Sequence, residues 1–257
     1  MKKTLFGINP EEAYEKFLRE SKNKKSDSSE TNNQANLTVP ANIIKQDYVQ
    51  IPGTSRIISK REIHKGRKWQ DSHYDLESNG LFMPTPSLFM HYFMQVRQAA
   101  DGKLQLYDAA NNPISAQETR NLWKYLTSDF EGGAWSWLDA KFILGLGVLG
   151  LDIETDHRVI GKDKRLQGKQ SPLEACLNQD TFANLDFNSQ GLANVISSQQ
   201  TYIPNENIYF WYPRPNSVAG FGADAGRAGL GCGGDPADSD SGLGVFACAE
   251  GTQKSKK

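Results

Sequence analysis

Long apolar stretches are absent from this chain of 257 residues. A helix that crosses a bilayer needs about 20 mainly apolar residues. The longest candidate, residues 142–151, has only ten residues, and three of them are glycine. The start Met1-Lys2-Lys3 resembles that of a signal peptide, but the apolar stretch after it, residues 4–8, is too short for one. We therefore expect no membrane span and no conventional secretion signal.

Cysteine is scarce as well, with only Cys176, Cys232 and Cys248 in the chain. Three cysteines cannot all pair, and none stands in a spacing that would indicate a metal site. We expect each to be a small buried apolar residue of a protein that folds in a reducing compartment.

An excess of one charge is missing too. The chain has 29 Lys and Arg against 30 Asp and Glu, which gives no reason to expect nucleic-acid binding.

Recognisable catalytic and metal-binding motifs are also missing. The four histidines, at 64, 73, 91 and 157, share no metal-ligand spacing, so each is predicted to be structural. Residues 238–242 have the cadence of a calcium loop, but Leu243 and Ala249 stand where an EF-hand needs Gly and Glu. Residues 145–150 spell G-x-G-x-x-G without a βαβ unit around them, which favours strand packing. We expect neither an enzyme nor a bound cofactor or metal.

The first part of the chain differs in charge and composition from the rest. Residues 1–68 hold fourteen Lys and Arg against eight Asp and Glu, a net charge of +6. Residues 10–20 start with a proline and acidic residues and carry an apolar stripe, which predicts a short helix. Residues 21–36 are almost wholly polar and are predicted to be disordered. Residues 1–20 are then either a docking element for a larger assembly or a frayed terminus.

From residue 37 onwards the pattern is one of short strands, turns and few helices. Ser115–Glu118 is a capping box that predicts a helix to about residue 128, and another helix is expected over 93–100. The charged residues 152–170 are expected to form a surface excursion. The other predicted elements are strands over 48–53, 55–59, 104–107, 207–212 and 243–249, and short helices over 173–177 and 191–198. This mixture indicates an α+β fold.

Glycine is concentrated near the end of the chain, where ten of the 23 glycines lie within residues 220–251. Apolar residues alternate with these glycines at the spacing of a strand, first Phe221, Ala223 and Ala225, then Leu230 and Cys232. One side of this segment is therefore predicted to be buried, while the other side holds only Gly or Asp. Glycine in a strand costs about 0.5–1 kcal/mol relative to Ala, so stability does not explain so many glycines on one face.

A codon argument supplies a reason for this composition. The Asn codons AAC and AAT become codons for Gly, Asp or Ser when guanine replaces adenine in their first two positions. A Gly, Asp and Ser series at alternating positions is therefore the expected product of adenine-directed mutagenesis of an Asn-rich template. In this respect the sequence resembles the variable proteins of diversity-generating retroelements, whose C-terminal variable region is rewritten from a template repeat.

The order of segments agrees with this resemblance. The aromatic strand Phe210-Trp211-Tyr212 is followed by residues 216–219, then Pro236, then residues 242–246. The resemblance implies a C-type lectin fold of the type related to formylglycine-generating enzyme, with residues 131–138 as a core segment. It covers residues 203–250 and, more loosely, 81–200. Val245-Phe246 stands where Phe-Arg is usual, and the calcium-dependent sugar motifs of animal lectins do not occur.

The resemblance implies a ligand-binding display protein in four parts. These are the helix and linker 1–36, a strand-rich extension 37–80, a C-type lectin-like domain 81–251 with a variable region at 217–242, and a basic tail 252–257. Its partner is expected to be a protein or cell-surface ligand, and its location a virion or cell-surface assembly. Because Asp is frequent on the variable face and Arg227 is its only long side chain, we expect weak binding or a cationic ligand.

The predicted ligand-binding face consists of Gly220, Gly222, Asp224, Gly226, Arg227, Gly229, Gly231, Gly233, Gly234, Asp235, Asp238, Asp240 and Gly242. Trp211, Tyr212, Arg214 and Asn216 are expected to flank it, although Trp211 is more readily explained as a core residue. Two alternatives remain open. The fold could be a formylglycine-generating-type oxidase that uses Cys232 and Cys248, which lie sixteen residues apart. It could also be a virion or adhesin component that is not diversified.

Overall fold

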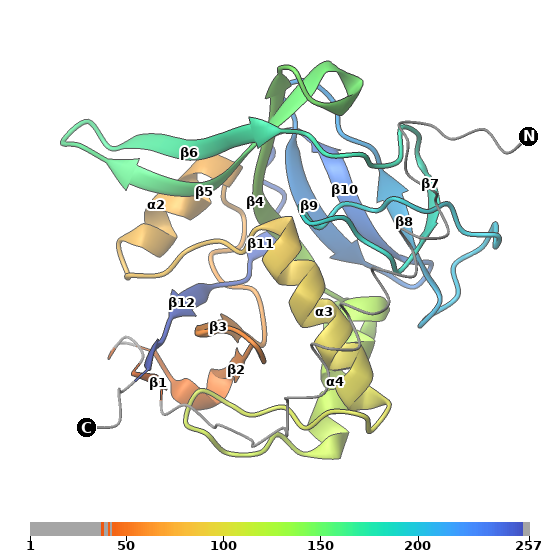
Figure 1. Ribbon diagram of the computed structural model, residues 1–257. Helices are drawn as coiled ribbons and strands as arrows, with labels where there is room; N and C mark the ends of the chain where they lie inside the picture. The colour runs from red at the N-terminus through yellow and green to blue at the C-terminus, as the bar shows by residue number, and fades with distance from the viewer. Residues whose placement is uncertain (1–36, 39–40, 42, 254–257) are drawn as a thin grey trace, which may run out of the picture. The chain divides into compact units, whose positions relative to one another are not determined.

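The computed structural model describes residues 37–38, 41 and 43–253, which fall within one compact unit, Asn36–Lys257. The helix predicted over 10–20, the linker 21–36 and residues 254–257 of the tail lie outside the described residues. The described part contains three α-helices, an eight-stranded mixed sheet and a small three-stranded sheet, so the predicted α+β class is confirmed (Figure 1). No helix in this part is long and apolar enough to cross a membrane.

The large sheet has the strand order β6-β5-β4-β9-β10-β8-β7, and β11 pairs with β4 off this path. β8 is parallel to β10 and β11 is parallel to β4, while the other neighbours are antiparallel. The strands are β4 (Trp135–Leu144), β5 (Leu151–Ile160), β6 (Arg165–Pro172), β7 (Thr181–Asn184), β8 (Asn207–Trp211), β9 (Val218–Ala223), β10 (Ala228–Gly234) and β11 (Gly244–Val245). The glycine-rich segment thus forms the β9–β10 hairpin near the middle of the sheet.

The small sheet joins chain segments that are far apart in sequence. Its order is β12-β3-β2, and a separate pair is formed by β1 and β13. These strands are β1 (Leu37–Thr38), β2 (Tyr48–Gln50), β3 (Arg56–Ser59), β12 (Cys248–Glu250) and β13 (Thr252–Gln253). The prediction of one strand over 243–249 is wrong, because β11 pairs with the large sheet and β12 with the small one. The run is buried throughout, since it bridges both sheets.

Three α-helices pack on these sheets: α2 (Trp69–Glu77), α3 (Pro86–Ala100) and α4 (Ala116–Thr127). Short 3-10 turns occur at η1 (Lys45–Asp47), η2 (Phe130–Gly132) and η3 (Val148–Gly150). α2 has no counterpart among the predicted elements. The predicted start of α3 at residue 93 is wrong, because Thr85 caps the helix through the Leu88 N–H and Pro86 occupies the first turn.

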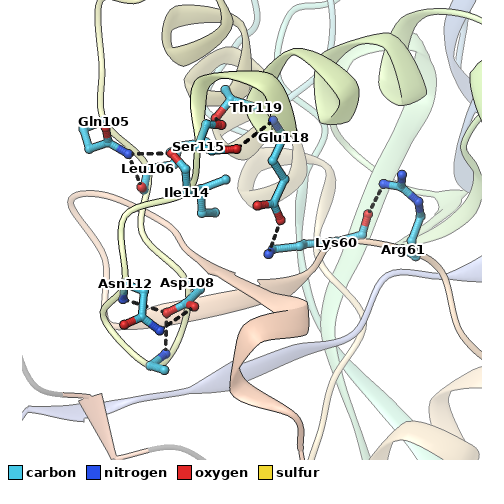
Figure 2. A network of polar contacts seen from close by, with 11 residues as sticks. Lys60, Arg61, Gln105, Leu106, Asp108, Asn112, Ile114, Ser115, Glu118 and Thr119 are labelled. Carbon is cyan, nitrogen blue, oxygen red and sulfur yellow. Dashed lines mark hydrogen bonds and ion pairs between the residues drawn. The ribbon is translucent and has the colours of Figure 1, made fainter.

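α4 is the helix predicted from the capping box, and half of that box forms. Ser115 Oγ accepts the Glu118 N–H at 3.2 Å, as predicted. The Glu118 carboxylate, however, turns to Lys60 and binds its ammonium group (Figure 2). The cap therefore also ties the start of α4 to the segment after β3.

The helices cover one face of the β9–β10 hairpin. The ring of Phe221 in β9 lies 4.8 Å from that of Phe89 and 5.7 Å from that of Phe93, both in α3. Phe93 also packs against Trp123 of α4, at 4.9 Å between ring centroids. Full burial of an aromatic side chain of this kind stabilises a fold by roughly 1.5–3 kcal/mol. The apolar side of the hairpin is thereby fixed against the helices, and its glycine side faces the other way.

Residues 152–170 were predicted to form a surface excursion. In the structure they form the long β5–β6 hairpin of the large sheet (Figure 1). β5 buries Ile153 and His157, whereas β6 is exposed or half-buried along its whole length. Only Leu166 and Gly168 of β6 are half-buried, and no residue of the strand is fully buried, so its sequence does not show the period of two on which strand prediction depends.

Three further predictions are wrong about the type of element. Residues 173–177 and 191–198 form no helix, and 104–107 form no strand. The apolar residues behind these predictions, including Leu106, Leu173 and Leu192, are nevertheless buried. In the loop at 105–114, the Gln105 side chain donates to the carbonyls of Leu106 and Ile114 (Figure 2). These side-chain bonds add to isolated backbone bridges of Tyr107 with Pro113 and of Asp108 with Val49, which do not extend into a strand.

Candidate functional site

The β9–β10 hairpin shows the predicted alternation of burial. Phe221, Leu230 and Cys232 are buried on the side of the helices. Gly220, Gly222 and Gly231 lie on the opposite side and are only partly covered. In the register, Gly222 pairs with Gly229 and Gly220 with Gly231. Glycines therefore face glycines across the two strands and leave a strip of bare backbone.

Tryptophans from the flanking strands rise on both sides of this strip. Trp135 and Trp137 of β4 pair with Gly222 and Gly220. On the other side, Trp211 of β8 pairs with Gly231. Together they enclose a groove of about 370 Å³ with a glycine floor and tryptophan walls. Trp135 is 53% exposed, so the groove opens to solvent.

The glycines of the floor have ordinary backbone conformations. None of the eight glycines in 220–242 has a positive φ. A Cβ added at Gly222 or Gly231 would lie 4.0 Å or 3.7 Å from its nearest neighbour, which is normal van der Waals contact. At Gly229 the same atom would lie 2.4 Å from the Trp211 ring, so that ring would have to move. Gly222 and Gly231 can therefore accept a side chain that would point into the groove. Gly220 and Gly234 are tighter, with a Cβ 3.2 and 3.0 Å from a backbone oxygen.

The alternation changes at a β-bulge near the end of β10. Sequence spacing alone puts Gly233 on the groove side after Gly231. The register shifts between Gly231 and Gly234, however, and Gly234 lies in the groove, where its Cβ would be 3.2 Å from the Trp137 ring. Gly233 faces the Arg214 side chain instead. An extra residue in one strand makes every later side chain of that strand point to the opposite face of the sheet. The prediction that Gly233 lies on the groove side is therefore wrong.

The four aspartates of the predicted face all act as turn residues. Asp224 Oδ1 accepts the N–H groups of Gly226 and Arg227, at 2.7 and 3.0 Å. Asp235, Asp238 and Asp240 each accept the N–H two residues ahead, at 2.8–3.1 Å. Such bonds are typical of Asx turns. The expected strand alternation therefore stops at residue 234, and residues 235–243 form a loop in which Asp238 and Leu243 line the groove.

Arg227 lies over an aromatic platform at the groove rim. Its guanidinium carbon is 4.8 Å from the ring centroids of both Tyr209 and Trp211. These two rings of β8 are edge-to-face at 4.7 Å. Cation–π contact fixes the side chain without neutralising its charge. Within the described residues Arg227 makes no ion pair, so its single positive charge only partly offsets the two carboxylates, Asp224 and Asp238, that line the same groove.

The predicted flanking residues separate into two groups. Trp211 is half-buried and forms a groove wall, so its assignment to the core is wrong. Tyr212, Arg214 and Asn216 do not line the groove. Arg214 pairs with Asp180 at 2.9 Å, and Asn216 occupies a turn at φ 64. Gly226, Asp235, Asp240 and Gly242 also lie outside the groove lining.

A buried carboxylate anchors the tryptophan wall from behind. Glu62 accepts the Trp135 N–H at 2.8 Å and the hydroxyl proton of Tyr125. Burial raises the pKa of Glu62 above its ordinary value, and these two hydrogen bonds only partly oppose that rise. The backbone of Trp135 is therefore held by the core, although its ring is exposed.

The role of Trp135 in the groove wall has no signal in the sequence. The prediction of a core segment over 131–138 holds for Trp137, whose side chain is 3% exposed, but it is wrong for the ring of Trp135. Spacing places the two rings on one side of a strand, and only the pairing of β4 with β9 shows what lies beside them. That pairing joins residues more than eighty positions apart, so no local signal identifies it.

A second cluster was missed for the same reason. His73 of α2, Asp139 of β4 and His157 of β5 are buried together. The ligand atoms that they offer lie within 4.8 Å of one another. No motif spacing links these positions, because each comes from a different element.

Comparison with known proteins found no family model, no curated protein and no solved structure that matches this chain.

Proposed function

We propose that this protein is a ligand-binding display protein of the kind found in diversity-generating retroelements, with a C-type lectin-like fold. The groove of β9 and β10 is its binding site, and the residues on the glycine side of the hairpin are its diversified positions. The comparisons supply no relative, so the proposal rests on the sequence resemblance and on the geometry of the groove.

The observation that carries the proposal is the conformation of the groove glycines. They stand at negative φ, and Gly222 and Gly231 have room for a Cβ, as does Gly233 beside the groove. A protein that is rewritten at these positions must fold with many different residues there, and this backbone permits it. The buried side of the hairpin supplies rigidity, so binding requires no ordering of a flexible loop.

The groove chemistry favours a cationic, partly apolar group of a protein partner. The exposed Trp135 ring offers a face for cation–π contact. Asp224 and Asp238 line the same groove, and each has one carboxylate oxygen that accepts no hydrogen bond from the described residues. A Lys or Arg side chain would meet both features. With glycine at most positions, this copy lacks the anchors that give high affinity.

The buried thiols favour a binding protein over the oxidase alternative. Cys232 and Cys248 are fully buried and unpaired. Burial raises the pKa of both thiols well above the ordinary value. The thiolate is the reactive form of cysteine, so both residues are held in their unreactive form.

The proposal is tested by restoring the residue that the codon argument implies for the template. In the variant Gly222→Asn/Gly231→Asn/Gly233→Asn, the circular dichroism spectrum should stay unchanged and the melting temperature should fall by less than about 5 °C. The matched control is the single variant Gly133→Asn, which should not fold. If the triple variant unfolds and the control does not, the groove is not a diversified surface.

The coding DNA provides an independent test. It should contain a near-identical second copy of the region for residues 217–242 that differs only at adenines, beside a reverse transcriptase gene. Absence of both would remove diversification and leave the non-diversified virion or adhesin component as the better interpretation.

The ligand class is tested with an Arg-rich peptide and tryptophan fluorescence. Binding should be weak, and the double variant Asp224→Asn/Asp238→Asn should lower the affinity about threefold to tenfold. Asparagine preserves the acceptor of each Asx turn, so the change removes charge alone. An equal affinity for both proteins would exclude recognition of a cation by these carboxylates.

A further inference from the structure

Three buried polar side chains meet between α2 and the strands β4 and β5. His157 Nδ1 lies 2.5 Å from Asp139 Oδ1, and His73 Nε2 lies 3.7 Å from the same oxygen. The three side chains are only 2–4% exposed. Asp139 Oδ2 is already engaged, because it accepts the His157 backbone N–H at 3.0 Å. Both imidazole rings are therefore directed at the one remaining carboxylate oxygen.

The hydrogen bonding of this cluster is incomplete. His73 Nε2 is buried and has no hydrogen-bond partner, and 3.7 Å is too long for a bond to Asp139. A buried polar atom without a partner is rare in folded proteins and calls for an explanation.

A metal ion accounts for this arrangement. Zinc binds imidazole nitrogen and carboxylate oxygen at about 2.0–2.2 Å, which places the ligand atoms of a tetrahedral site roughly 3.3 Å apart. Here the three ligand atoms lie within 4.8 Å of one another, so small side-chain movements suffice to reach that geometry. Two imidazoles and a carboxylate suit a first-row divalent cation.

The surroundings hold both rings in place. The Trp69 ring is edge-to-face with His73 at 4.4 Å and with His157 at 4.9 Å. Gly168 gives the His157 ring its space, because a Cβ there would lie 2.6 Å from Nε2. Glu154 Oε2 is 3.9 Å from the same Nε2. At this distance Glu154 makes no hydrogen bond to the ring, but it places a negative charge beside a histidine that would bind a cation.

We propose that His73 Nε2, Asp139 Oδ1 and His157 Nδ1 bind one divalent metal ion, with Zn²⁺ as the best fit. Three protein ligands leave the fourth position of a tetrahedral ion to a water molecule. The near-complete burial of the three side chains leaves no approach for an organic substrate, so we assign the ion a structural role. It fastens α2 to β4 and β5.

This fastening extends to the candidate groove. The N-terminal end of α2 and the loop before it hold the segment that lines the groove. The Trp69 N–H donates to the carbonyl of Pro236 at 3.3 Å, and the Gly66 N–H donates to that of Leu243 at 2.9 Å. The Trp137 Nε1–H donates to the carbonyl of Arg67 at 3.0 Å. The metal would stiffen one wall of the groove whatever the groove binds.

The test uses the full chain, stripped of metal with a chelator and then titrated with Zn²⁺. Elemental analysis after gel filtration should find one zinc per chain. The melting temperature should rise by about 5–10 °C when zinc is 100-fold above its dissociation constant, and should fall again with chelator. A wild-type chain that retains no zinc and shows no shift would overturn the proposal, even if every variant fails to fold.

Variants separate this site from adventitious binding. The chain has only four histidines, so all of them can be compared. His73→Gln and His157→Gln should each lower the zinc affinity at least tenfold and remove most of the shift in melting temperature. The control His64→Gln/His91→Gln, which changes the two histidines outside the cluster, should behave as the wild type. Loss of zinc in the control, or full binding by His73→Gln, would contradict the assignment.

Discussion

Glycine has different roles in two regions of this protein. Among the twelve glycines between residues 53 and 191, an added Cβ at Gly145, Gly147 or Gly168 would lie only 2.1–2.6 Å from another atom. The other nine have positive φ: Gly53, Gly66, Gly80, Gly102, Gly132, Gly133, Gly150, Gly161 and Gly191. In 220–242 no glycine has positive φ, and only Gly229 would bring a Cβ closer than 3.0 Å to a neighbour. The framework requires glycine for its backbone geometry, whereas the groove does not.

The largest effect is expected at Gly133, which stands at φ 66. A Cβ there would lie 2.1 Å from the Ala223 carbonyl oxygen and 2.7 Å from that of Ser128. Both obstacles are backbone, so Gly133→Ala should lower the free energy of unfolding by at least about 4 kcal/mol. Urea denaturation measures this loss.

Gly132→Ala is the matched control. Gly132 also has positive φ, but a Cβ there would meet nothing within 4 Å, so only the cost of its backbone conformation applies, about 1–2 kcal/mol. Equal losses at both positions would show that the close approach of Gly133 to β9 does not restrict the framework.

Glu62 tests whether the groove wall belongs to the framework. Glu62→Ala leaves the Trp135 N–H and the Tyr125 hydroxyl without their acceptor, so the free energy of unfolding should fall by about 2–4 kcal/mol. Glu62→Gln keeps an acceptor for Trp135 and should cost less. Chemical denaturation of both variants at neutral pH measures the difference, and equal stability of Glu62→Ala and the wild type would contradict a framework role.

The same residue gives a pH dependence of known sign. The pKa of Glu62 is higher in the folded chain than its ordinary value of 4.5, so the folded state binds more protons between these two values. Stability should therefore fall as pH rises from 4.5 through the folded pKa, by about 1.4 kcal/mol for each unit that separates them. Glu62→Gln should remove this part of the pH profile. Unfolding curves that keep the same slope in the variant would assign it to another group.

The smallest effect is expected on the groove floor. Gly231→Ser should change the free energy of unfolding by less than about 0.5 kcal/mol, because its Cβ has normal contacts and its backbone is ordinary. Gly229→Ser should cost about 1–2 kcal/mol, since the Trp211 ring must move aside. Thermal unfolding of the pair measures both. A large loss at Gly231 would place the groove glycines with those of the framework.

Local patterns predicted those parts of the fold that depend on local chemistry. The cap at Ser115 and the alternation around Phe221 were read from neighbouring residues, and both occur in the structure. The Asx turns at Asp235, Asp238 and Asp240 had a local signal as well, because Asp followed by Pro, Ser or Gly is typical of turns. The prediction that these aspartates continue the strand alternation is wrong, because residues 235–243 form a loop.

Other features depend on contacts that no local pattern contains. The β6 strand has no buried face, so its residues show no period. The bulge near Gly234 comes from the fit of β10 against β9. Trp135, Trp211 and Gly222 come from three strands that meet only in the folded sheet. The groove was therefore half predicted: its floor follows from the alternation, and its walls do not.

Period and composition are enough to predict the α+β class and the buried side of the glycine-rich hairpin, because they decide which face of a strand leaves water. The residues that stand beside that hairpin follow from strand order, which joins positions far apart in the chain. The same holds for His73, Asp139 and His157. These three residues come together because α2 packs against the β4–β5 pair, and their spacing along the chain does not predict this contact.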